Sequence, residues 1–599
     1  MRLKTSRNGV ALGSLALLIA IGAATGQAGS AQDRPESILP PGFGDPAPAP
    51  TPAPTRAAPS GDTPPPSPAP GTVQPLPSRT PVPGPTPSPT PTATPTPIDL
   101  AAYELPSFAK RSLDQVGTIG ADSGGVPATA FANSDGPTVQ RLMRGLDAPI
   151  PSRWLSIALR RVLASRVDTP RGVDGADFAA ERAWLLLRMG EADVARAVVQ
   201  SVDVENYTPK LFAVAMQAML ATGDPAGLCP LVEPAIRVSN ENGWLFARSM
   251  CTALSGKGPA AIVQLRAARR RTGNSIDALL AEKVVGAAAQ ARAVTIEWPG
   301  VDRLSAWRLG LSLATGVEVP EELLAQGGPQ IAYWRATSPM IAPDVRATLA
   351  DRAAAQGVLS NLALVDLYSE VESVDSANTA VVATARDLRG AFNDAVPATR
   401  LRLMRQLWSE PSTNAARYGR LVLTARAAAA IVPSAETVED APKLIASMLS
   451  AGHDRAAIRW GSTVAGKGDG WAMLALADPR RRVATADQVE SYGGRESLKA
   501  RMLFAGLAGL GRLSVEETQE LAEPFDVKVG AENSWTRAIA AAARRGDAGT
   551  VVLLMAVGMQ TPDWRGVPPE VLFHGVSALR AVGMGGEARM IAAEAIARL

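Results

Sequence analysis

Three glycines at a constant interval constrain the fold of this chain more than any other feature. Gly190, Gly223 and Gly256 lie 33 residues apart, each between segments rich in alanine, leucine and valine. Glycine commonly ends a helix in the left-handed conformation. An acidic residue such as Glu191 then favours the positive N-terminus of the next helix. The spacing therefore predicts helical hairpins that repeat every 33 residues.

The same turn is expected twice more near the end of the sequence, at Gly546 and Gly586. The tripeptide Gly586-Glu587-Ala588 is identical to Gly190-Glu191-Ala192, which predicts equivalent positions in two hairpins. The last segment then carries a single apolar stripe at helical spacing, formed by Ala588, Ile591, Ala592, Ala595, Ile596 and Leu599.

From residue 151 onward, segments of about 10 to 16 residues alternate with Gly, Pro or Asn turns, as in helical proteins, and strand-like alternation is almost absent. We therefore expect residues 151–599 to be all-α. Hairpins of this length resemble the tetratricopeptide (TPR-like) repeat family. The resemblance is good for residues 177–275 and plausible for residues 500–599. The Trp and Tyr positions of that family are mostly unmatched, and no register is set over 276–499. The resemblance implies an α-solenoid that binds peptides or protein partners on a concave surface.

The N-terminus has the three parts of a secretory signal peptide. Arg2, Lys4 and Arg7 precede an apolar stretch over 10–24, and small residues follow, with cleavage expected after Ala28 or Ala31. The apolar stretch would rise only ~22 Å as a helix, less than the ~30 Å hydrocarbon core, although an uncleaved anchor stays open. We assign residues 1–31 to the signal peptide and expect a periplasmic or secreted protein.

Proline dominates the next segment, with 23 prolines between Pro40 and Pro97. Proline fixes φ and removes a hydrogen-bond donor, so the segment is expected to be extended polyproline II. Residues 32–97 are therefore predicted to be a disordered Pro/Thr-rich linker. Residues 98–150 are predicted to mix a short helix with loop.

The charge of the chain argues against a nucleic-acid partner. Its formal net charge is only +3 over 599 residues, which gives no global field toward nucleic acid or a membrane surface. Membrane contact is expected only through an uncleaved signal sequence, if at all. The arginine runs at 266–271 and 480–482 are interpreted as solvated helix ends, and contact with an anionic envelope polymer is the alternative.

The stretch "GSTVAGKG" (461–468) has the outline of a phosphate-binding P-loop. A P-loop needs a preceding strand and a hydroxyl after the lysine, whereas the preceding stretch is predicted to be helical and position 468 is glycine. We expect a helix–helix turn and no nucleotide. The two histidines, His453 and His574, have no partners at metal-ligand spacing, so no metal site and no cofactor is expected.

Two functional classes remain. The first is an exported, non-catalytic protein–protein interaction or assembly scaffold of the cell envelope, with a protein or peptide partner. The alternative is a peptidoglycan-active enzyme, similar to a lytic transglycosylase, or its accessory factor, with Glu496, which is expected in a helix, as candidate acid. Because Glu496 lacks the glycine-rich surroundings of those enzymes, we expect no catalytic residue. The tryptophans are expected mostly in the core.

The two cysteines give the sharpest structural prediction. Cys229 falls early in the second helix of the hairpin that turns at Gly223, and Cys251 falls late in the next helix. The two helices should run antiparallel about the turn at 239–243, and each cysteine is eleven residues from Asn240. Because export permits disulfides, we predict a Cys229–Cys251 bridge, with two buried free thiols as the alternative.

Overall fold

The computed structural model of the chain describes residues 106–147, 149–290, 294–374, 378–464, 466, 468–480 and 483–599. The expected signal peptide (1–31), the expected linker (32–97) and residues 98–105 lie outside the described residues. The described part contains 28 α-helices and two strands of two residues each, which confirms an all-α protein. No helix in this part is both long and apolar enough to cross a membrane.

The first described segment is a mixture of short helical elements and loop, and it also holds a small sheet. The elements are η2 (Ser107–Ala109), β1 (Gln115–Val116), η3 (Ala121–Ser123), η4 (Ala128–Phe131), α1 (Gly136–Gly145), α2 (Arg153–Ala164) and β2 (Val167–Asp168). β1 pairs antiparallel with β2, with Val116 opposite Val167. The buried Arg182 donates hydrogen bonds to the carbonyl oxygens of Val116, Leu163 and Ser165 and so holds this segment in place. Strands of two residues are too short for an alternation pattern to reveal them.

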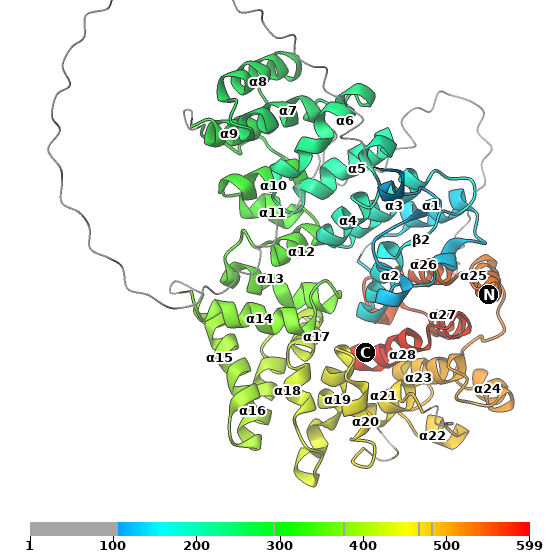
Figure 1. The fold of residues 1–599 in the computed structure, drawn as a ribbon. Coiled ribbons are helices and arrows are strands. Elements are labelled where there is room, and N and C mark those ends of the chain that lie inside the picture. Colours follow the sequence, from blue (N-terminus) through cyan, green and yellow to red (C-terminus); the bar gives the residue numbers. More distant parts are fainter. Residues whose placement is uncertain are drawn as a thin grey trace, which may run out of the picture. The chain divides into compact units, whose positions relative to one another are not determined.

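The next segment contains the predicted hairpins, and residues 175–288 are called the repeat segment below. Its elements are α3 (Gly175–Arg188), α4 (Ala192–Val199), η5 (Val204–Asn206), α5 (Pro209–Leu220), η6 (Pro225–Leu231), α6 (Val232–Val238), α7 (Gly243–Leu254), α8 (Gly258–Thr272) and α9 (Ile276–Ala288). Gly190, Gly223 and Gly256 have φ values of +88°, +81° and +81°, so the three left-handed turns are confirmed. Helices that are near in sequence pack together, including α3 with α4 and α7 with α8 and α9 (Figure 1).

The middle of the chain is built from shorter helices. These are α10 (Ala306–Thr315), α11 (Glu321–Gln326), α12 (Pro329–Thr337), α13 (Pro343–Ala355), α14 (Asn361–Val371), α15 (Thr379–Asn393), α16 (Pro397–Ser409), α17 (Asn414–Leu423), α18 (Ala425–Ala429), η7 (Ala435–Asp440), α19 (Ala441–Ser450), α20 (Asp454–Ile458), α21 (Asp469–Ala477) and α22 (Ala486–Glu490). The helix predicted before Gly461 is only partly present, because the left-handed Gly452 ends α19 and α20 has five residues.

The last segment contains the other two predicted turns, of which one is correct. Its elements are α23 (Leu498–Gly509), α24 (Val515–Ala522), α25 (Ser534–Arg545), α26 (Ala548–Gly558), η8 (Trp564–Gly566), α27 (Pro569–Ala581) and α28 (Gly585–Arg598). Gly546 is left-handed, as predicted, with φ +77°. The prediction for Gly586 is wrong, because Gly586 lies inside α28 and Gly583, with φ +84°, makes the turn.

Hydrogen bonds explain why the repeated tripeptide is misleading. The amide of Gly583 donates to Arg580 O, just as the amide of Gly190 donates to Leu187 O. Gly583 is therefore the structural equivalent of Gly190, and the match at Gly586 is a coincidence of sequence. The apolar stripe itself is confirmed, since all its members except the half-buried Leu599 are buried.

One contact was not anticipated: segments far apart in the sequence close on each other. α2 packs against α26 and α28, and α28 also contacts α19, α21, α23 and α27 (Figure 1). Glu594 of α28 accepts hydrogen bonds from the Ser152 hydroxyl and from the backbone amides of Arg153 and Trp154, at 2.6, 2.8 and 3.1 Å. These groups form the N-terminal end of α2. In a simple solenoid each repeat contacts only its neighbours, so this closure is an additional level of structure.

Candidate functional site

The two cysteines lie where the repeat register placed them. Their sulfur atoms are 2.06 Å apart and their Cα atoms 5.4 Å apart, which is disulfide distance. Cys251 lies in α7, as predicted, whereas Cys229 lies in the 3₁₀ helix η6 and not in an α-helix. Pro225 and Pro230 account for the difference, because proline donates no backbone hydrogen bond. The pair belongs to the scaffold of the repeat segment and forms no reactive site.

The best-formed candidate for a binding site is a cavity of about 490 Å³, called the aromatic cavity below. It lies among segments that are distant in sequence, namely α16, α17, α19, the start of α21, η8 and the end of α28. A volume of about 300–1,000 Å³ is typical of ligand pockets. No sequence motif marks the cavity, because each segment contributes only one to a few lining residues.

Three buried aromatic side chains, Trp408, Tyr418 and Trp564, contribute to the lining. Trp408 Nε1 donates to the hydroxyl of Thr424 at 2.8 Å, whereas Trp564 Nε1 has no hydrogen-bond partner in the described part of the chain. Burial raises the pKa of the Tyr418 hydroxyl, which therefore stays protonated and able to donate. The guanidinium of Arg598 lies 4.5 Å from the centre of the Tyr418 ring, a cation–π contact.

Positive charge predominates at the edge of the aromatic cavity. Arg417, Lys443 and Arg565 are exposed and line it, and none forms an ion pair with a carboxylate of the described residues. Lys499, by contrast, pairs with Asp469 at 2.5 Å. Asp563 also lines the cavity, but the three cations outnumber it. Beside an aromatic surface they favour a ligand that carries both carboxylate and apolar groups.

The lining offers no evident catalytic set. No His, Cys, Ser or Thr is among the described residues around the cavity. Across the described residues, no group of three or more His, Cys, Asp or Glu side chains could hold a metal ion.

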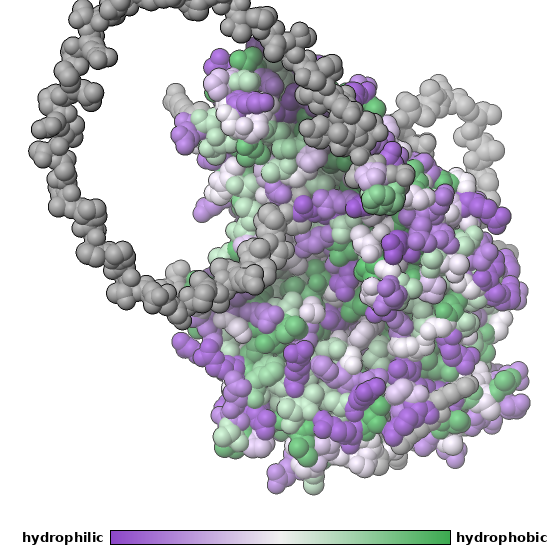
Figure 2. Space-filling view, in the orientation of Figure 1, coloured by the Kyte–Doolittle hydropathy of each residue, from purple (hydrophilic) through white to green (hydrophobic). Residues whose placement is uncertain are grey.

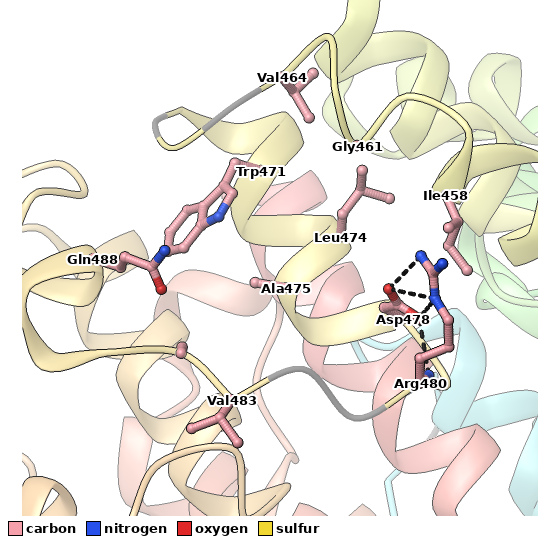
Figure 3. A pocket seen from close by; sticks show the side chains of 11 residues that line it. Ile458, Gly461, Val464, Trp471, Leu474, Ala475, Asp478, Arg480, Val483 and Gln488 are labelled. Carbon is pink, nitrogen blue, oxygen red and sulfur yellow. Dashed lines mark hydrogen bonds and ion pairs between the residues drawn. The ribbon is translucent and has the colours of Figure 1, made fainter.

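The P-loop-like stretch lies beside a different, smaller cavity of about 140 Å³ (Figure 3). Ile458, Val464, Trp471 and Leu474 give this cavity an apolar lining. Among the described residues that line it, the one cation is Arg480, which is held by Asp478 at 2.8 Å. The segment follows the short helix α20 and turns, and the described residues around it form no strand. Lys467 and Arg481–Arg482 lie outside the described residues.

The other candidate residues are placed apart from one another. Glu496 is exposed in the turn before α23, and not within a helix as assumed from the sequence. His453 precedes α20 and His574 lies in α27. Burial lowers the pKa of both histidines. Glu496 is not among the described residues that line the cavities of about 140 and 490 Å³.

Most tryptophans belong to the core, as expected: Trp184, Trp244, Trp307, Trp334, Trp408, Trp460 and Trp564 are buried. Hydrophilic and hydrophobic residues are interspersed over the face drawn in Figure 2. Exposed large apolar side chains, such as Phe108, Val263 and Val432, come from separate segments. The visible face therefore offers mixed patches, and the aromatic cavity is the more specific feature.

A scan against protein-family models finds no match, and searches of curated proteins and of solved structures find no similar chain.

Proposed function

We propose that the protein is an exported, non-catalytic scaffold of the cell envelope that binds a protein or peptide partner. In this proposal residues 1–31 direct export and residues 32–97 are a spacer. The helical part is a TPR-like solenoid whose distant segments are brought together. The aromatic cavity receives an acidic segment of the partner.

The aromatic cavity is the observation that carries the proposal. Its buried aromatic side chains provide an apolar contact surface, and aromatic residues are frequent energetic anchors at protein interfaces. Its edge carries Arg417, Lys443 and Arg565, which have no ion-pair partner among the described residues. These cations can orient a carboxylate-bearing peptide and favour its approach.

Site-specific crosslinking in the native envelope tests the proposal. A photoreactive phenylalanine analogue would replace Lys443 at the cavity, and in a control protein it would replace the exposed Arg266 on α8. We expect a distinct crosslinked partner from position 443 only. The yield of this crosslink should fall about tenfold when Arg565→Glu is added. The photoreactive residue has already removed the charge of Lys443, and the added variant reverses the charge of Arg565, which weakens contact with an acidic segment. Identical crosslinks from both positions, or yields indifferent to Arg565→Glu, would argue against the aromatic cavity as the binding site.

The enzymatic alternative has its own test. The purified chain is incubated with cell-wall glycan, and soluble muropeptides are measured by chromatography. The scaffold proposal expects no release above a buffer control. Release that disappears in Glu496→Gln would instead establish a peptidoglycan-active enzyme.

A further inference from the structure

A second cavity, of about 510 Å³, has a different chemical character from the aromatic cavity. Three of its lining residues are arginines, Arg512, Arg580 and Arg589, and none of its described lining residues is Asp or Glu. It lies where the ends of α21, α23 and α27 meet the beginning of α28. We call it the arginine cavity.

The arginines are held in place by the carbonyl ends of two helices. Arg512 donates to the carbonyl oxygens of Ala475 and Asp478, and Arg589 donates to that of Ala477, all at the end of α21. Arg589 also pairs with Asp454 at 3.5 Å, so the charge of this arginine is partly compensated. Arg580 donates to Leu510 O at the end of α23, at 3.2 Å. These bonds fix the guanidinium groups and partly offset their charge through the helix dipoles. A guanidinium has five N–H donors, however, and Arg580 uses one in the hydrogen bond described.

Two backbone features complete the arginine cavity. Gly585 begins α28 at the cavity, and the preceding Met584 supplies no side-chain acceptor for the first amides of this helix. Gly511 has φ +64°, and a Cβ on it would overlap Nη1 of Arg580, so the glycine makes room for this guanidinium. Three arginine side chains and the beginning of α28 therefore meet at one open cavity.

We propose that the arginine cavity binds the phosphate group of a ligand. Three arginines and a helix N-terminus attract an anion. Donors that come from three separate helices or turns match a tetrahedral group with three free oxygens and a double charge. A carboxylate presents two oxygens in one plane and a single charge, and it would leave part of the donor set without an acceptor.

Binding of small anions to the full chain tests this proposal by isothermal titration calorimetry at low ionic strength. The probes are inorganic phosphate, pyrophosphate and succinate. We expect saturable binding of at least one phosphate probe and binding of succinate at least about tenfold weaker, with an affinity for phosphate that falls as salt is added. Vesicles that contain phosphatidic acid form a further arm, in which binding by co-sedimentation would place the phosphate on a lipid headgroup.

The variants separate the arginine cavity from general positive charge. Arg580→Gln removes an exposed cation and should weaken binding of the phosphate probe that binds, or of the vesicles, about tenfold. Gly511→Ala should weaken it as well by displacing Arg580. The matched control, Arg266→Gln, changes an exposed arginine on α8 and should leave binding unaltered. No binding of any phosphate probe or vesicle, equal affinity for succinate, or equal loss in the control would overturn the proposal.

Discussion

The repeat segment and the closure of α2 on α28 are stabilised in different ways. In the repeat segment, helices that are near in sequence pack on one another, and left-handed glycines set the turns between them. In the closure, Ser152 and Glu594 are 442 residues apart, and buried polar groups make the contact. One region is specified by local pattern, and the other by a few individual side chains.

The difference teaches that a buried charge can define the position of a whole helix. Glu594, 3% exposed, accepts the first amides of α2 and also pairs with Arg598 at 2.9 Å. Arg153, likewise buried, reaches the carbonyl oxygens of Ser450 and Leu359, at 3.0 and 3.1 Å. Burial lowers the pKa of this guanidinium to about 10. The beginning of α2 is thus fixed against three other parts of the chain.

Removing the closure carboxylate should have the largest effect. Glu594→Ala leaves the amides of Arg153 and Trp154 without their acceptor and removes the carboxylate that pairs with Arg598. Loss of one partner of a buried charged network destabilises by about 3–5 kcal/mol. Urea denaturation should show this decrease in the free energy of unfolding, while the exposed Glu520→Ala should change it by less than about 0.5 kcal/mol. Equal effects of the two variants would mean that the closure adds little stability.

The cysteine pair gives the next largest effect, confined to the repeat segment. Cross-linking residues 22 apart should stabilise by about 3 kcal/mol through loss of unfolded-state entropy. Mass spectrometry of the non-reduced protein should find one linked peptide pair. Hydrogen exchange of Cys229→Ser/Cys251→Ser should then increase in η6, α6 and α7 and remain unchanged in α28. Two freely alkylated thiols in natively exported protein would refute the bridge.

A buried carboxylate between the two regions should make stability depend on pH. Glu191 lies at the turn after α3 and pairs with Arg160 of α2 at 2.8 Å, and burial raises its pKa to about 7. The pKa of Glu191 in the folded state is above the ordinary 4.5, so the protonated carboxyl group contributes stability that is complete below pH 4.5. This contribution is lost as the pH rises through about 7, where the buried group becomes charged. Between pH 5 and 8, the wild type should lose about 2 kcal/mol relative to Glu191→Gln. Parallel pH profiles of unfolding free energy would contradict this.

The smallest effect compares two turns within the repeat segment. Alanine in a left-handed conformation costs about 1–2 kcal/mol, and this applies at both Gly190 and Gly256. A Cβ at Gly256 meets open space, whereas one at Gly190 would lie 2.6 Å from the Cβ of Tyr333. Gly190→Ala should therefore destabilise by about 1 kcal/mol more than Gly256→Ala. Thermal unfolding of the two variants measures the difference, and identical midpoints would show that Tyr333 moves freely.

The sequence predicts features that depend on local spacing. The helices of the repeat segment, the turns at Gly190, Gly223 and Gly256, and the distance between Cys229 and Cys251 follow from the 33-residue interval. The turn at Gly546 follows from its glycine between two helical segments. The sequence is misleading at Gly586. The tripeptide that begins there is identical to the one at Gly190 but lies inside a helix, because three residues do not determine a turn without the helix before them.

Long-range features cannot be predicted in this way. Trp408, Tyr418 and Trp564 meet at the aromatic cavity only after the helices between them have packed. Glu594 is indistinguishable in sequence from a solvated helical glutamate, since nothing near it indicates burial. Contacts between residues so far apart depend on the tertiary arrangement, and a single sequence contains no local signal for that arrangement.

The closure of α2 on α28 also imposes an order in time. Chains emerge from the ribosome at about 5–20 residues per second, so the partner of Ser152, 442 residues later, follows after about 20 to 90 seconds. Throughout this interval α2, whose Leu155, Leu159 and Val162 are buried in the complete fold, lacks α26 and α28, against which it later packs. A newly made chain therefore cannot complete the packing of its first helices until α28 has been synthesised.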